Sequence, residues 1–94
     1  MLGGPSAAMP ADDAIKKIAK DMKEKAEKAL GETYVEFEAV KYTKQIVNGT
    51  NYNIKVKVGG NNYVHIKVHV PLPVNNAPNQ LLEQCKGKTL ADPL

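Results

Sequence analysis

The sequence has very few of the residues on which several classes of site depend. Among its 94 residues there is one cysteine, Cys85, and there is no arginine and no tryptophan. A single thiol cannot form an internal disulfide or a four-cysteine zinc site, and this cysteine usage is typical of a reducing compartment, most simply the cytoplasm. Arginine is the side chain most used to contact guanine edges, so its absence argues against sequence-specific nucleic-acid binding.

Long apolar runs are also absent. No segment approaches the ~20 apolar residues that a membrane-spanning helix requires. Residues 1–10 contain neither a charged first region nor an apolar stretch, so we expect no signal peptide. The chain is 43% hydrophobic and 24% charged with a net charge of +3, which is ordinary for a globular protein. Its length predicts one domain over residues 1–94.

An amphipathic helix is predicted over residues 12–30. Asp12 or Asp13 can cap its start, and Gly31 can end it with a positive φ. Residues 1–11 are small residues, Gly and Pro, and we expect them to form a flexible leader. The lysine-rich face of the helix is expected to be solvated and its apolar face to pack on a core rather than a membrane. The apolar stripe comprises Ile15, Ile18, Ala19, Met22, Ala26, Ala29 and Leu30.

After the helix the apolar period changes to two, which predicts strands over residues 33–47, 51–58 and 63–70. A slip in the alternation near Ala39 is what a β-bulge produces. A weaker pattern suggests a last edge strand over residues 80–86. The predicted fold is therefore α+β, with one N-terminal helix packed across a short antiparallel β-meander that spans residues 33–90.

This topology predicts which connections share an end of the sheet. The leader, the turn at residues 48–51 and the loop at 71–79 should converge on one edge, with the turn at 59–62 opposite. Each convergent tip is apolar where a loop is usually polar: Met1-Leu2, Ile46-Val47 and Leu72-Pro73. The tips could form a binding edge or could cap the open end of the core, and the pattern favours neither.

No catalytic, cofactor-binding or metal-binding arrangement is evident, so we expect neither an enzyme nor a cofactor. Cys85 lies in a weakly patterned segment and is expected to be an ordinary thiol. His65 and His69 are predicted on the solvent face of one strand, ~13 Å apart, too far to share one metal ion. Lys55 and Lys57 are likewise predicted to face solvent.

The segment Gln45-Ile46-Val47-Asn48-Gly49 resembles the Q-x-V-x-G loop of the cystatin superfamily. Residues 50–56 look like the strand that follows this loop in stefins, the type 1 cystatins. The glycine-bearing leader and the Leu72-Pro73 pair match the stefin pattern at the right distances. The resemblance covers residues 1–74. Residues 75–94 depart from it, because they lack the tyrosine-bearing final strand of stefins, and their role stays open.

The resemblance implies reversible, noncovalent, competitive inhibition of papain-like cysteine proteases such as cathepsins. Leu2 would fill an apolar subsite on the non-primed side, and Gly3 would let the chain pass close to the catalytic thiol. The alternative is a cystatin-fold interaction protein that does not inhibit. A monomer is expected, although opening the 48–51 turn would let two chains exchange the helix and first strand. The protease-binding residues implied are Leu2, Gly3, Gly4, Gln45, Ile46, Val47, Asn48, Gly49, Leu72 and Pro73.

Overall fold

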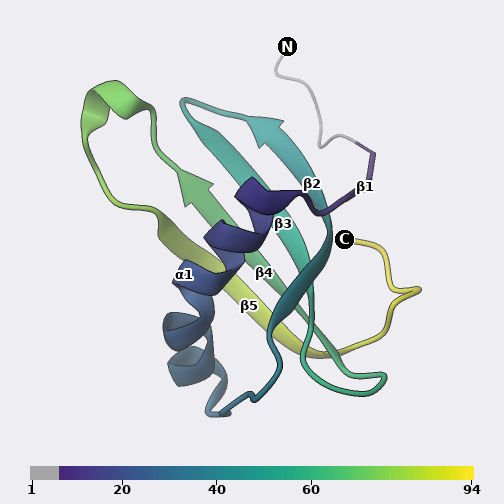
Figure 1. Cartoon of the computed structure of the whole chain (residues 1–94). Coiled ribbons are helices and arrows are strands. Elements are labelled where there is room, and N and C mark those ends of the chain that lie inside the picture. The colour runs from purple at the N-terminus through teal and green to yellow at the C-terminus, as the bar shows by residue number, and fades with distance from the viewer. Residues whose placement is uncertain (1–6) are drawn as a thin grey trace.

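The computed structural model describes residues 7–94, apart from the side chain of Asn75. Over these residues, one helix lies across one face of a five-stranded antiparallel sheet with the strand order β1-β2-β3-β4-β5 (Figure 1). The predicted α+β fold is confirmed. In chain order the elements are β1 (Met9–Pro10), α1 (Asp13–Leu30), β2 (Glu38–Ile46), β3 (Thr50–Lys57), β4 (Tyr63–Val70), the short 3-10 helix η1 (Pro73–Asn75) and β5 (Gln80–Lys88).

Helix α1 begins and ends where its capping residues predict. The Ile15 amide donates to the Asp12 side chain at 2.9 Å, which satisfies one of the free N–H groups at the helix start. Gly31 ends the helix with a φ of 69°. Ala19 and Ala26 are completely buried, and their small side chains let the helix approach the sheet closely. None of the helices in residues 7–94 combines the length and apolar character that crossing a membrane requires.

The core lies between α1 and the inner face of β2, β3 and β4. Strands β3 and β4 contribute most of the sheet's share of it, because their alternating Val and Ile side chains point toward the helix. The buried residues that α1 and the sheet contribute to this cluster are Ile15, Ala19, Met22, Ala26, Ala39, Tyr42, Ile54, Val56, Val64, Ile66 and Val68.

The first long strand is shorter than predicted. It was expected over residues 33–47, but β2 begins only at Glu38 and ends at Ile46. Val35 is fully exposed, so the alternation before Glu38 does not mark a face of the sheet. The Tyr34 amide instead donates to Glu27 Oε2 at 2.7 Å, which ties this segment to the helix. The predicted bulge is confirmed as a register shift between Ala39 and Lys41.

Part of the expected leader forms a strand. Met9 and Pro10 make up β1, which pairs with Tyr42 and Lys41 of β2, and the Ala11 amide donates to the Val40 carbonyl at 3.0 Å. Two residues are too few to show a periodic pattern, and proline is tolerated at a sheet edge, so this strand could not be predicted from the sequence.

Lys55 corrects a second expectation, because it is buried rather than exposed to solvent. Only 2% of its surface is exposed. Its Nζ donates to three backbone carbonyls of the C-terminal segment, those of Thr89 (2.8 Å), Leu90 (2.6 Å) and Asp92 (2.5 Å). Burial lowers the pKa of the Lys55 ammonium. The C-terminal segment is thereby fastened to the outer face of the sheet, directly after β5.

Candidate functional site

Two connections meet at one end of the sheet. The β2–β3 turn and the β4–β5 connection lie at the upper end in Figure 1, near the start of α1, whereas the β3–β4 turn lies at the opposite end. Strand β1 is antiparallel to β2, so it runs away from this end of the sheet. Of the implied protease-binding residues, the structure brings together those of the two connections; Leu2, Gly3 and Gly4 lie outside the described residues.

The β2–β3 turn is tight and closed by its own backbone. Ile46 and Thr50 form the last pair of the ladder. The Val47 amide donates to the Gly49 carbonyl at 3.1 Å. Asn48 has a φ of 48° and Gly49 a φ of 116°. Asparagine is among the residues that adopt such a left-handed conformation most readily, which explains its presence at the tip.

Gly49 joins this turn to the second connection. The residue is buried, and a Cβ placed on it would lie 2.6 Å from the Val70 carbonyl oxygen and 3.0 Å from Cε1 of His69. Such a close approach of two backbones is open only to glycine. The turn therefore rests against the end of β4, from which the β4–β5 connection departs, and the two connections are held in a fixed relation.

Both connections carry apolar side chains that remain exposed. Ile46 is 63% exposed, Leu72 is 40% exposed and Val74 is 84% exposed, while Gln45 and Val47 are half-buried. Exposed apolar side chains gathered at one end of a domain are typical of a binding surface. Ile46, Leu72 and Val74 are not part of the buried core cluster. Sequence reasoning missed Val74, whose position in a Pro- and Asn-rich loop shows no periodicity.

A row of polar side chains lies directly behind the turn on the outer face of the sheet. Gln45, Asn51, His69 and Gln80 are successive cross-strand partners from β2 to β5. His69 Nδ1 lies 2.6 Å from Asn51 Oδ1. His69 was expected to be an ordinary surface residue, but it is half-buried and hydrogen-bonded. This role depends on strand register, which the sequence does not display.

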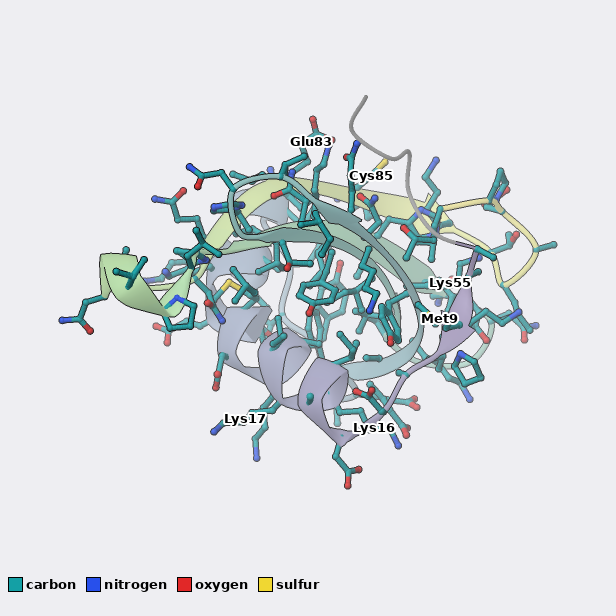
Figure 2. The ribbon with its side chains drawn as sticks, turned by 90° about the horizontal axis from the view of Figure 1, so that it is seen from above. Met9, Lys16, Lys17, Lys55, Glu83 and Cys85 are labelled. Atoms are coloured by element: carbon teal, nitrogen blue, oxygen red, sulfur yellow. The ribbon has the colours of Figure 1, made fainter. Side chains whose placement is uncertain are left out.

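One histidine and one cysteine lie next to each other on the outer face of the sheet. His65 and Cys85 are cross-strand partners, and Figure 2 shows Cys85 and Glu83 on the side of the sheet away from α1. The Cys85 thiol donates to its neighbouring Lys86 carbonyl at 3.8 Å. His65 Nε2 is buried and has no hydrogen-bond partner among the described residues. The two groups are adjacent but do not form the bonded nucleophile and base that covalent catalysis needs.

The charge of His65 follows from the same surroundings. Burial lowers the pKa of the imidazole, and the nearby Lys55 and Lys88 lower it further. The lowered pKa favours the neutral form of the His65 ring. Within residues 7–94, no three side chains of His, Cys, Asp or Glu come together in a way that could hold a metal ion.

The comparisons with known proteins agree with this arrangement. A family model described as "Cystatin domain" matches residues 3–93. The chain is 48% identical over 94 residues to "Cystatin-A1" of Sus scrofa, an alignment that covers all of this chain and 91% of that protein. It is 43% identical to "Cystatin-B" of Oplegnathus fasciatus, covering 100% and 94%. It is 45% identical to "Leukocyte cysteine proteinase inhibitor 1" of Sus scrofa, covering 100% and 91%.

Proposed function

The chain belongs to the cystatin family, and from this we propose that it is a reversible, noncovalent, competitive inhibitor of papain-like cysteine proteases, with cathepsins as the target class. The observation that carries the proposal is the pair of apolar connections at one end of the sheet, fixed to each other where Gly49 packs on the Val70 carbonyl. A relative of similar length is named a cysteine proteinase inhibitor.

In the proposed complex this end of the sheet enters the active-site cleft. Residues 45–49 lie over the centre of the cleft, and Leu72 and Pro73 lie on its primed side. Leu2 occupies an apolar subsite on the non-primed side, with Gly3 passing close to the catalytic thiol. Val74, the most exposed apolar residue of the second connection, extends the contact beyond Pro73.

The turn geometry explains why the complex does not proceed to cleavage. Hydrolysis requires a scissile carbonyl held beside the catalytic thiol in an attack geometry. The turn closes on itself, because the Gly49 carbonyl accepts the Val47 amide at 3.1 Å and the backbone at Asn48 and Gly49 is left-handed. The turn therefore occupies the cleft without presenting an extended peptide bond to the catalytic thiol. Because no bond is cleaved or formed, the inhibition is reversible.

The affinity of a small interface of this kind depends on a few apolar side chains that are buried on binding and on loops that already have their bound conformation. Few residues of any interface carry most of the binding energy, and these are usually buried apolar or aromatic side chains. A turn that is already in its bound conformation loses little conformational entropy on binding. The exposed apolar side chains of Ile46 and Leu72 on a pre-formed turn and loop meet both conditions.

The proposal includes the setting in which the inhibitor acts. We place it in the cytoplasm, consistent with the free thiol of Cys85, as a monomer without catalytic activity. Its partner is a protease, and nucleic acids and membranes have no part in the proposed function.

The test is a titration of papain and cathepsins with the full chain. We expect competitive inhibition that is fully reversed on dilution. Leu72→Asp should weaken it about tenfold, because a charge replaces an apolar anchor. Leu82→Asp is the matched control, since Leu82 is similarly exposed, 45% against 40%, but lies on β5. No inhibition at micromolar inhibitor would contradict the proposal and favour the non-inhibitory interaction protein.

A further inference from the structure

The polar row behind the turn includes a side chain, His69, that lies against the turn itself. His69, near the end of β4, is the cross-strand partner of Asn51, and Asn51 is in turn the partner of Gln45 in the β2–β3 hairpin. The 2.6 Å contact joins His69 Nδ1 to Asn51 Oδ1. With the amide in this orientation the oxygen accepts and the imidazole N–H donates.

The same ring lies against the tip of the hairpin. A Cβ on Gly49 would be 3.0 Å from Cε1 and 3.3 Å from Nε2 of His69. One edge of the imidazole thus bonds to the strand that leaves the turn, and the other edge supports the turn from beneath. With the Val70 carbonyl oxygen, the His69 ring forms the surface on which Gly49 rests.

We propose that His69 is a positioning residue for protease inhibition: it holds the β2–β3 turn in the conformation that enters the cleft, through its hydrogen bond to Asn51 and its contact with Gly49. The inference rests on the proposed inhibitory function and adds to it a residue that acts through the turn.

The His69–Asn51 hydrogen bond lies outside the core, so its effect on the turn can be measured separately from the stability of the whole domain. Backbone pairing of β3 with β4 extends from Lys57↔Tyr63 to Thr50↔Val70, and it does not require the His69 side chain. The core side chains of β4 point to the opposite face of the sheet. Removing the imidazole should therefore loosen the turn and leave global unfolding almost unchanged.

The variants are His69→Ala, His69→Gln and, as matched control, Lys67→Ala, a half-buried residue on the same strand and face. His69→Ala should raise the inhibition constant for papain about three- to tenfold, the range expected for one lost hydrogen bond. His69→Gln can still donate to Asn51 and should recover most of this loss. Lys67→Ala should have no effect on inhibition, and the urea midpoint of His69→Ala should fall only by the small amount that one hydrogen bond contributes.

A second readout does not involve the protease. The Val47 amide donates to the Gly49 carbonyl inside the turn, so its hydrogen exchange reports directly on turn opening. It should exchange faster in His69→Ala and at the parent rate in His69→Gln. In a double-mutant cycle, Asn51→Ala added to His69→Ala should cost little more than either change alone.

Three results would overturn the inference: an unchanged inhibition constant in His69→Ala, unchanged exchange of Val47, or a loss of inhibition that only follows a lowered urea midpoint. Failure of the parent chain to inhibit papain is a distinct result. It would overturn the proposed function, and the exchange of Val47 would then decide whether His69 holds the turn.

Discussion

Among single residues of the described chain, Gly49 is the glycine whose replacement the structure tolerates least, because both its backbone conformation and its surroundings exclude a Cβ atom. Gly49→Ala faces both a φ of 116° and the Val70 carbonyl oxygen 2.6 Å from the new Cβ. We expect a destabilisation of about 1–3 kcal/mol and a loss of papain inhibition of at least about tenfold, because the turn must move.

Gly59 supplies the matched control, since it has a similar φ of 123° with nothing within 4 Å of an added Cβ, and it lies at the opposite end of the sheet. Gly59→Ala should lower the unfolding free energy somewhat and leave inhibition unchanged. The two variants are compared by urea unfolding and papain titration. Equal effects of both on inhibition would contradict the role assigned to Gly49.

Lys55 is the other residue whose environment decides its role. Lys55→Met should lower the unfolding free energy by about 1–3 kcal/mol, because three carbonyls of the C-terminal segment lose their charged donor. Lys57→Met removes only a long contact of 4.0 Å to Glu36 and should cost less than about 0.5 kcal/mol. Urea unfolding measures both, and equal costs would show that Lys55 does not fasten the C-terminal segment.

Among the helices and strands, periodicity predicted the elements whose pattern lies within their own segment. It missed the features that depend on pairing with residues far away in the sequence. α1 and β4 follow their patterns closely, because caps and alternating Val and Ile lie within each segment. β5 is longer than expected, ending at Lys88 instead of at residue 86. Two register shifts against β4 disturb its alternation, which explains why its pattern in the sequence is weak.

The candidate site likewise has features that the sequence predicted and features that it did not. The glycine of the turn and the apolar Leu72-Pro73 pair could be recognised from the sequence, and the topology of a meander placed them at one end. The Asn51–His69 bond and the burial of Lys55 could not, because each depends on a partner that pairing or the C-terminal segment brings close. The structural placement of Leu2 lies outside the described residues.

The connecting elements give a test of which end of the molecule binds. Val74 in η1 and Val35 between α1 and β2 are both highly exposed, 84% and 102%, and lie at opposite ends of the sheet. Val74→Asp should raise the inhibition constant for papain about tenfold, and Val35→Asp should not change it. Neither substitution should shift the urea midpoint, since neither side chain is in the core. A stronger effect of Val35→Asp would place the binding surface at the end of the sheet opposite the β2–β3 turn and would contradict the proposed site.

At the scale of the whole molecule, the β2–β3 turn is also the hinge that could open. If β1, α1 and β2 of one chain packed on β3 to β5 of another, the core would be preserved and residues 45–49 would straighten. Heating followed by size-exclusion chromatography should then yield a dimer that does not inhibit papain, because Gly49 no longer packs against the Val70 carbonyl and the inhibitory turn is lost. A dimer that inhibits as well as the monomer would contradict this.

The central claim is that one end of the sheet enters the cleft of a protease. Hydrogen–deuterium exchange of the full chain with and without papain tests it most directly, because it maps contact along the backbone. Exchange in residues 45–49 and 72–76 should slow when papain is added, and exchange in residues 59–62 at the far end should not change. Protection of residues 59–62, or none at either connection, would contradict it.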